Sequence, residues 1–197
     1  MITGFILAGG ASSRIGREKA LLSMGTRTLI ELVLERLRPC VQQVVVIGNA
    51  HNAPALEALT HVRVLTDLKP AHGPLMGIYT GLRHTDTPLN VFVGCDMPWL
   101  DGRLIERLTN AWSEQVESVA SLHPLEGVQP FPLVCHLRAC RRVGALLDGG
   151  QRSLKTLLHA PSARLVRIEE PELQRSFANI NTVEDYAKLT EDAPVAS

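Results

Sequence analysis

In residues 6–22, ILAGGASSRIGREKALL, an apolar run ends in paired glycines and leads to a cationic segment that includes Arg14 and Lys19. The apolar run, residues 2–8, predicts a buried strand that enters this turn. Glycines let backbone N–H groups approach a ligand, and both cations can bind phosphate oxygens. Two interpretations stay open: a surface connection with solvated cations, or a loop that holds an anion.

The spacing of the glycines separates this turn from two common phosphate-binding motifs. Gly9 and Gly10 are adjacent and Gly16 comes well after them, which does not match GxGxxG. No Gly-Lys-Ser or Gly-Lys-Thr follows, so the turn is not a Walker A loop either. A nicotinamide-dependent dehydrogenase is excluded on the first ground.

Strand-like and helix-like patterns alternate along the chain. In the first half, the pattern predicts strands over 2–8, 43–48, 62–66 and 89–96, and helices over 28–39, 54–59 and 74–84. In the less regular second half it predicts strands over 116–122, 131–137 and 163–169, helices over 101–113, 140–147 and 154–158, and a closing helix that begins with a capping box of Thr182 and Asp185. Such alternation predicts an α/β fold with a mostly parallel sheet and helices on both faces.

Composition limits the classes of function. The chain has 197 residues, and its 20 basic and 20 acidic side chains cancel, so no overall field favours nucleic acid or an anionic membrane. The cysteines form no CxxC pair and the histidines no HxxxH pattern, which argues against a structural zinc site or a metal centre of histidines. We expect a monomeric cytoplasmic protein of one domain with free thiols.

Polar residues follow the predicted strands where ligands of open α/β sheets collect. Asp96 ends the fourth strand, and its carboxylate suits Mg²⁺; the alternative is a helix cap or a surface turn. Asp67 ends the third strand and could accept from a ribose hydroxyl or a base N–H, whereas a turn-forming role is the alternative. The same two interpretations apply to Asn49, after the second strand. Together with the glycine turn, these ends predict a nucleoside triphosphate bound with Mg²⁺.

Two other features are weaker indications of a functional site. The stretch 149–158, GGQRSLKTLL, places Arg152 and Lys155 before and within a short helix, which could bind a second anion or could be an ordinary solvated helix start. Cys95 precedes Asp96, but a thiol on a buried strand is the simpler interpretation than a nucleophile.

Four motifs, in order and over nearly the whole chain, resemble one family. LAGGASSRIGREKALL resembles the LAGGxSxRMGxDKxLL signature of the molybdenum cofactor guanylyltransferases, in the nucleotidyltransferase superfamily. GPLMGIYTGL is similar to that family's GPLAGxxxGL, GCDMPWL to its xCDxPxL, and FANINTVEDY to its FxNxNTPEDL. The chain departs from the family at Ile15, Glu18, Arg27 and Ile47, where the usual residues are Met, Asp, Lys and Asn.

The resemblance implies the Rossmann-like fold of nucleotide-diphospho-sugar transferases and an enzyme that joins GMP from GTP to molybdenum-bound molybdopterin, with release of pyrophosphate. The implied GTP contacts are Leu7, Ala8, Gly9, Gly10, Lys19, Asn49, Asp67 and Asp96, with Asp96 as the Mg²⁺ ligand. The implied catalytic groups are Arg14, Lys19 and Asp96. On the acceptor side we expect Arg152, Asn179 and Asn181, with Gln129 as a further candidate.

Because the acceptor phosphate is already anionic, the implied in-line attack on the α-phosphorus needs positioning and charge neutralisation rather than a strong base. The paired glycines favour guanine, since the similar cytidylyltransferases usually have LAAG and a methyl group would crowd a purine edge. The alternatives are a cytidylyltransferase, a nucleotidyltransferase acting on a sugar, alditol or methylerythritol phosphate, and a catalytically silent GTP-binding regulator.

The resemblance also organises the chain. We expect one nucleotidyltransferase domain over 1–190, with a nucleotide-binding half over 1–100, an acceptor-binding half over 101–190 and a tail over 191–197. GTP and molybdenum-molybdopterin would be its substrates, and proteins that carry molybdopterin or receive the finished cofactor its transient partners.

Overall fold

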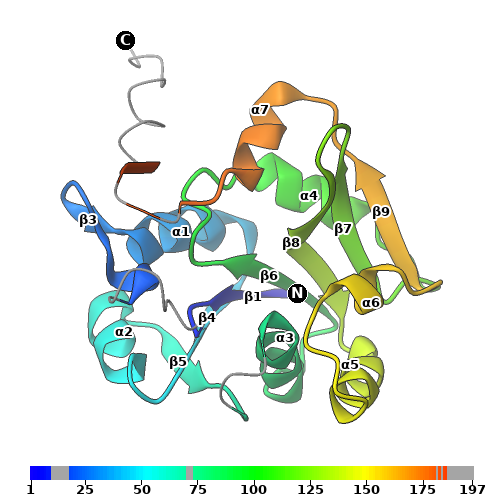
Figure 1. Ribbon diagram of the computed structural model, residues 1–197, viewed down its shortest axis with the longest axis horizontal. Coiled ribbons are helices and arrows are strands. Elements are labelled where there is room, and N and C mark those ends of the chain that lie inside the picture. Colours follow the sequence, from blue (N-terminus) through cyan, green and yellow to red (C-terminus); the bar gives the residue numbers. More distant parts are fainter. Residues whose placement is uncertain (10–17, 70–72, 181, 183, 186–197) are drawn as a thin grey trace.

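The computed structural model describes residues 1–9, 18–69, 73–180, 182 and 184–185. Its main sheet has seven strands in the order β5-β4-β1-β6-β8-β7-β9 (Figure 1). These strands are β1 (Ile2–Leu7), β4 (Gln43–Gly48), β5 (Arg63–Thr66), β6 (Leu89–Gly94), β7 (Ser118–His123), β8 (Gly127–His136) and β9 (Ala163–Arg167). The helices are α1 (Leu29–Leu37), α2 (Ala53–Thr60), α3 (Pro74–Arg83), α4 (Gly102–Asn110), α5 (Ala139–Asp148), α6 (Lys155–Leu158) and α7 (Pro171–Gln174).

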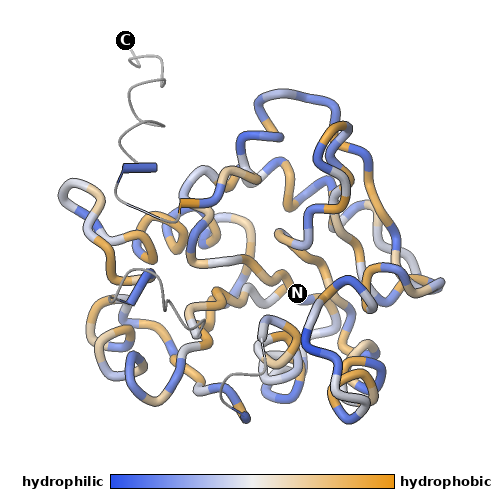
Figure 2. The backbone as a smooth tube through the Cα atoms, viewed as in Figure 1, coloured by the Kyte–Doolittle hydropathy of each residue, from blue (hydrophilic) through white to orange (hydrophobic). Residues whose placement is uncertain are grey.

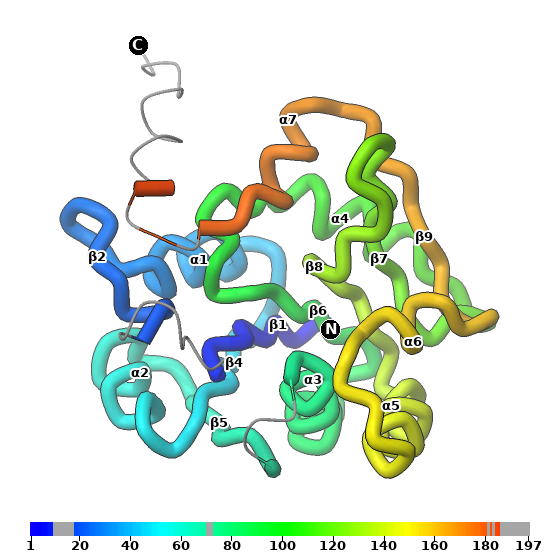
Figure 3. Tube along the Cα trace, in the orientation of Figure 1, coloured from blue at the N-terminus to red at the C-terminus, as the bar shows by residue number. Residues whose placement is uncertain are grey.

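The sheet is mostly parallel, as the alternating pattern predicts. β1 pairs in parallel with β4 on one side and β6 on the other, and β4 pairs in parallel with β5. β8 runs antiparallel to both β6 and β7, and β9 pairs in parallel with β7. Figure 3 shows the consequence: the N-terminal half of the chain lies on one side of the molecule and most of the C-terminal half on the other.

Two hydrophobic clusters cover the two faces of the sheet, and consecutive strand residues alternate between them. Ile6 and Val93 pack with α1, α2 and α4, whereas their neighbours Phe5 and Phe92 pack with α3, α5 and α6. The rings of Phe5 and Phe92 stack with centroids 4.9 Å apart. In Figure 2 hydrophobic residues follow the central strands, as expected for strands buried on both faces.

The predicted helices and strands are confirmed, with shifts at their ends. α1 begins after Thr28, whose hydroxyl and backbone N–H both contact the Glu31 carboxylate in a capping box, and it ends at Leu37 before a 3-10 turn. Asp101 caps α4 by accepting from the Arg103 N–H, as predicted. Thr182 and Asp185 exchange the reciprocal bonds of the predicted capping box, and the rest of the closing helix lies outside the described residues.

Three features differ from the sequence prediction: a hairpin, a short helix and the beginning of one strand. A small hairpin, β2 (Ser23–Met24) with β3 (Arg27–Thr28), precedes α1, and α7 forms a single turn near the C-terminus. β8 begins at Gly127, four residues before the predicted 131. Pro130 explains that difference, because proline cannot donate to a ladder and its presence argues against a strand. In the parts of the chain that the structure describes, no helix has the length and apolar character to cross a membrane.

Candidate active site

The carboxyl ends of four strands meet at one edge of the sheet. Leu7, at the end of β1, is in register with Ile47 of β4 and with Gly94 of β6, and Gly48 is in register with Thr66 of β5. From β1 the chain continues outward to β4 and then β5 on one side, and α3 returns it to β6 on the other side of β1. Such a switch in strand order is where open α/β sheets bind ligands.

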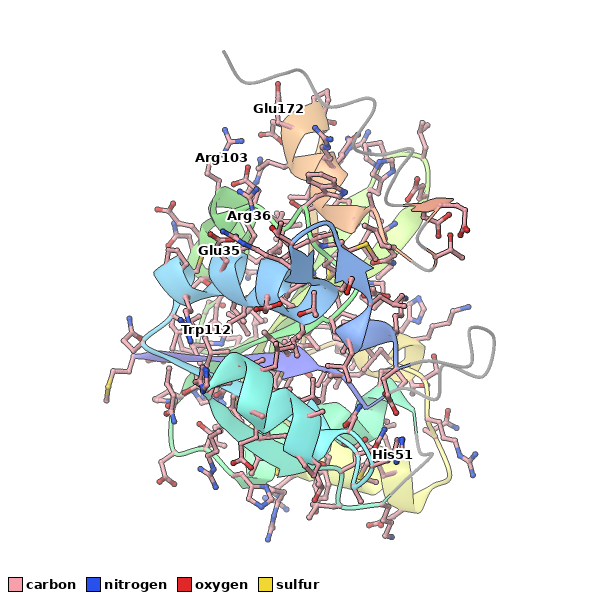
Figure 4. All side chains as sticks on the ribbon, turned by 90° about the vertical axis from the view of Figure 1, so that its left-hand side faces the viewer. Glu35, Arg36, His51, Arg103, Trp112 and Glu172 are labelled. Atoms are coloured by element: carbon pink, nitrogen blue, oxygen red, sulfur yellow. The ribbon has the colours of Figure 1, made fainter. Side chains whose placement is uncertain are left out.

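Lys19 and Asp96 form an ion pair at this edge. Lys19 begins a 3-10 turn over Lys19–Leu21, and its Nζ lies 2.8 Å from Asp96 Oδ2. The two side chains are 18% and 26% exposed, so the pair is partly buried but still accessible to a ligand. The structure therefore brings together a cation from the end of the glycine-rich turn and a carboxylate that follows β6, 77 residues apart. Figure 4 shows the side chains of the molecule as sticks, seen from the left-hand side of Figure 1.

The backbone around Asp96 fixes the direction of its carboxylate. The Cys95 N–H donates to the Leu7 carbonyl, and the Asp96 carbonyl accepts from the Ile180 N–H. The carboxylate lies back over Gly94, where a Cβ atom would be 2.3 Å from Asp96 Oδ1. A side chain at position 94 would displace the carboxylate from its present position, which gives a steric reason for the glycine two residues before Asp96.

The Asp67 carboxylate lies close to Gly9, beside the end of β4. A Cβ atom at Gly9 would lie 3.0 Å from Asp67 Oδ2 and 3.2 Å from the Gly48 carbonyl oxygen. Thr80, buried on α3, donates to Asp67 Oδ1 at 3.4 Å. Burial raises the pKa of Asp67, and the Thr80 hydrogen bond opposes this shift. A partly desolvated carboxylate beside an approachable backbone suits the recognition of a ligand hydroxyl or N–H.

Asn49 and Asn52 form the turn after β4. Asn49 Oδ1 accepts from the backbone N–H groups of His51 and Asn52, so this side chain holds its own turn, as in the alternative interpretation from the sequence. Asn52 Oδ1 accepts from the Asn49 N–H, while its Nδ2 donates to the Ala8 carbonyl and to Glu18. Sequence reasoning missed Asn52 and Thr80, because an Asn before a helix and a Thr within one carry no signal of distant partners.

The predicted acceptor residues lie on separate elements. Arg152 is exposed in the segment between α5 and α6, and its carbonyl oxygen would be 2.9 Å from a Cβ at Gly73, which precedes α3 with φ +72°. Asn179 is exposed beside Ile180, whose N–H contacts Asp96. Gln129 lies near the start of β8 and donates to Glu126.

The remaining predictions concern residues outside this edge or outside the described chain. Gly10, Arg14 and Asn181 lie outside the described residues. Lys155 begins a helix of only four residues, and its N–H donates to Ser153 Oγ. Arg27 is exposed on β3 and pairs with Glu35.

The interpretation of Cys95 as a buried thiol is confirmed. Its side chain is buried, and burial, with the charge of Asp96, raises its pKa to about 12. A thiol that stays protonated at neutral pH is a poor nucleophile. Among the residues that the structure describes, no group of three or more His, Cys, Asp or Glu side chains is placed to hold a metal ion. A cation at Asp96 would therefore take most of its ligands from substrate and water.

Comparison of the sequence with known proteins identifies its family. Residues 4–165 match the family model described as the MobA-like NTP transferase domain. A molybdenum cofactor guanylyltransferase of Serratia proteamaculans is 34% identical over 195 residues, which cover 97% of this chain and 95% of that protein.

Solved structures share the fold. The molybdopterin-guanine dinucleotide biosynthesis protein A of Archaeoglobus fulgidus superposes with a TM-score of 0.82 at 25% identity, covering 96% of this chain and 97% of that one. Rv0371C of Mycobacterium tuberculosis, in complex with manganese, superposes with a TM-score of 0.71 at 20% identity, covering 98% and 99%. The match over residues 4–165 and the full-length relative show that the chain belongs to the MobA-like NTP transferase family and is a nucleotidyltransferase.

Proposed function

We propose that this nucleotidyltransferase transfers GMP from GTP to molybdenum-bound molybdopterin, forming the guanine dinucleotide cofactor and pyrophosphate. The observation that carries the proposal is the Lys19–Asp96 pair at the switch point of the sheet, next to the close approach of Gly9 and Asp67. The name of the Serratia relative supports guanine as the base and the molybdenum cofactor as the product.

The residues at the strand ends fit a magnesium-bound triphosphate. Mg²⁺ typically takes one or two protein carboxylates and completes its shell with phosphate oxygens and water, and Asp96 offers one such carboxylate with a quarter of its surface exposed. When bound, the ion neutralises phosphate charge. Asp96 would hold it, and the fixed backbone on both sides of Asp96 keeps this carboxylate at the strand end.

The other residues would orient the two substrates. The Lys19 ammonium is suited to bind the phosphates, with Arg14 as its partner in neutralising the pyrophosphate charge. Leu7, Ala8, Gly9 and Gly10 would let the nucleotide lie against the backbone, and Asp67 would accept from the ribose or the base. Arg152, Asn179 and Asn181 are assigned to the pterin.

The reaction then needs little proton transfer. The terminal phosphate oxygen of molybdopterin forms a bond to the α-phosphorus of GTP, and the bond from that phosphorus to the bridging oxygen of pyrophosphate breaks. Alignment of the two reactants and stabilisation of the leaving charge supply the rate enhancement.

A transfer assay tests the proposal directly. The chain is incubated with Mg²⁺, molybdenum-molybdopterin and either GTP or CTP labelled at the α-phosphate, and the labelled dinucleotide is separated from the free nucleotide. We expect label transfer from GTP and little from CTP. Transfer from CTP alone would make the chain a cytidylyltransferase, and tight binding of GTP without any pyrophosphate release would make it a silent binding protein.

A further inference from the structure

One buried side chain joins both flanks of the glycine-rich turn. Asn52 is 1% exposed, and its Nδ2 donates to the carbonyl oxygen of Ala8 at 2.9 Å and to Glu18 Oε2 at 2.8 Å. Ala8 and Glu18 lie just before and just after residues 9–17. A single carboxamide from the β4–α2 connection therefore holds together two points that are ten residues apart in the chain.

The partners of this carboxamide fix its orientation. Nδ2 faces two acceptors, and Oδ1 faces a donor, the Asn49 N–H at 2.8 Å. A flipped carboxamide would place an acceptor against two acceptors and a donor against a donor. The fit around Oδ1 is also close, because a Cβ atom at Gly48 would lie 2.5 Å from Asn52 Oδ1.

The bond to Glu18 bears on the active site because Lys19 follows directly. Lys19 Nζ lies 2.8 Å from Asp96 Oδ2. Because Lys19 is bonded to Glu18 and starts a 3-10 turn, the position of Glu18 determines the position of the Lys19 backbone. Among the residues that the structure describes, the hydrogen-bond partners of the Asn52 carboxamide are Ala8, Glu18 and Asn49. Its effect on a ligand at the Lys19–Asp96 pair therefore passes through the two flanks that it holds.

We propose that Asn52 is a positioning residue for the nucleotide. By holding Ala8 and Glu18 at fixed positions, it presets the backbone after β1 and the placement of Lys19 before the triphosphate arrives. This inference rests on the proposed function for the identity of the ligand. A preset site loses less conformational freedom on binding, so removal of Asn52 raises the dissociation constant and the KM for the nucleotide.

The first test replaces Asn52 by its closest isostere in shape. Asn52→Asp loses both donors and sets a carboxylate against the Glu18 carboxylate and the Ala8 carbonyl. Titration calorimetry with Mg²⁺ and GTP, without acceptor, gives an expected rise of about 10- to 100-fold in the dissociation constant. Steady-state kinetics give a matching rise in the KM for GTP, with the KM for molybdopterin unchanged within about twofold.

Asn90→Asp is the matched control. Asn90 is also fully buried, and its Nδ2 donates to the Thr87 carbonyl near the start of β6. It lies six residues before Asp96 in the same strand and turn, roughly 20 Å away at the usual rise of a strand. Thermal unfolding shows a loss of stability in both variants, whereas only Asn52→Asp weakens nucleotide binding.

A second change tests the contact with Glu18. In the double variant Asn52→Asp with Glu18→Gln, the carboxamide of residue 18 can donate to the carboxylate of residue 52, which restores the bond with its polarity reversed. We expect recovery of GTP affinity by about fivefold or more relative to Asn52→Asp. A residue that served only stability would show recovery of the unfolding temperature without this recovery of affinity.

Gly48→Ala provides an independent route if Asn52→Asp does not fold. Its new methyl group would displace the carboxamide, so GTP binding weakens, while Gly149→Ala, whose methyl group meets only ordinary contacts from 3.4 Å, leaves binding unchanged. GTP affinity within about twofold of the wild type in folded Asn52→Asp, or in Gly48→Ala, overturns the inference. A wild-type chain that binds GTP but transfers no GMP overturns the proposed function alone, and one that binds no nucleoside triphosphate overturns both.

Discussion

The two halves of the molecule present their predicted site residues in different ways. In the first hundred residues, side chains from distant segments already contact one another: Lys19 with Asp96, and Asn52 with Ala8 and Glu18. In the second half, Arg152 and Asn179 are exposed, and they approach the first half through backbone atoms, the Arg152 carbonyl and the neighbouring Ile180 N–H.

Under the proposed function, we expect a preset nucleotide site in the first half and an acceptor site in the second half that becomes ordered only with its ligand. Preset charged groups cost little to reorganise when charge develops in the transition state. Changes in the first half should therefore affect turnover and nucleotide binding strongly, and changes in the second half should affect acceptor binding weakly and selectively.

The largest effect is expected from Asp96→Asn. This change removes the carboxylate proposed to hold Mg²⁺, and turnover should fall by about 10³-fold, in the range found when one key electrostatic contact is lost. Pyrophosphate release with GTP and molybdopterin measures it. Asp86→Asn, an exposed aspartate before β6, is the control and should behave as the wild type. Near-normal release by the Asp96 variant would remove this residue from the mechanism.

Gly94→Ala should have the next largest effect. A Cβ atom there lies 2.3 Å from Asp96 Oδ1, so the carboxylate must move while its chemistry stays intact. A displacement of about 1 Å can cost about 100-fold in rate, and we expect a fall in kcat of about 10- to 100-fold. Gly149→Ala serves again as the control. Unchanged kcat would show that the position of this carboxylate is not critical.

Asp67→Asn separates binding from stability. Loss of the charge should raise the KM for GTP about 10-fold, as expected for a hydrogen bond to a charged group. Burial raises the pKa of Asp67 in the folded state, so folding disfavours its charged form. The wild type therefore loses stability as the pH rises from the ordinary pKa of an aspartate, about 4, through the raised pKa.

The upward shift of the Asp67 pKa also predicts the stability of the Asp67→Asn variant. The substituted amide carries no charge, so the variant should unfold at a higher temperature than the wild type at a pH of about 7, and this advantage should disappear as the pH falls to about 4. Thermal unfolding across this range measures the difference. A variant less stable than the wild type at neutral pH would show that the Thr80 hydrogen bond outweighs burial.

The smallest effect is expected from Arg152→Ala. An exposed ion pair contributes up to about 1 kcal/mol, so the KM for molybdopterin should rise by about fivefold while the KM for GTP stays unchanged. Arg141→Ala, an exposed arginine of α5, is the control. An equal rise in the KM for GTP would contradict the separation between the two halves.

The sequence predicts the sheet well where apolar runs alternate with amphipathic helices. β1, β4 and β6 lie where the pattern indicates, because strands buried on both faces must be apolar throughout. β5, a partly buried strand at the edge of the sheet, also lies where the pattern indicates. The hairpin β2–β3 has two residues in each strand, too few to show a period. α7 is a single turn and equally short. In the second half, Pro130 argues against a strand, so the sequence does not predict residues 127–130 of β8.

The candidate site could be predicted only in part for a similar reason. Gly9, Lys19, Asp67 and Asp96 stand at strand ends or in a glycine-rich turn, where position along the chain indicates position in space. Asn52 lies 44 residues from Ala8 and 34 from Glu18, and its bonds to them depend on the register between β1 and β4. Local sequence carries no information about such a register-dependent contact.

A crystal structure of the chain with GTP and Mg²⁺ and without acceptor tests most directly whether the strand ends bind the nucleotide. We expect a metal ion bound by the Asp96 carboxylate, phosphate oxygens within hydrogen-bond distance of Lys19 Nζ, and the nucleoside against Gly9 and Asp67. A nucleotide bound elsewhere, or at this edge with Asp96 turned away from both metal and phosphates, would contradict it.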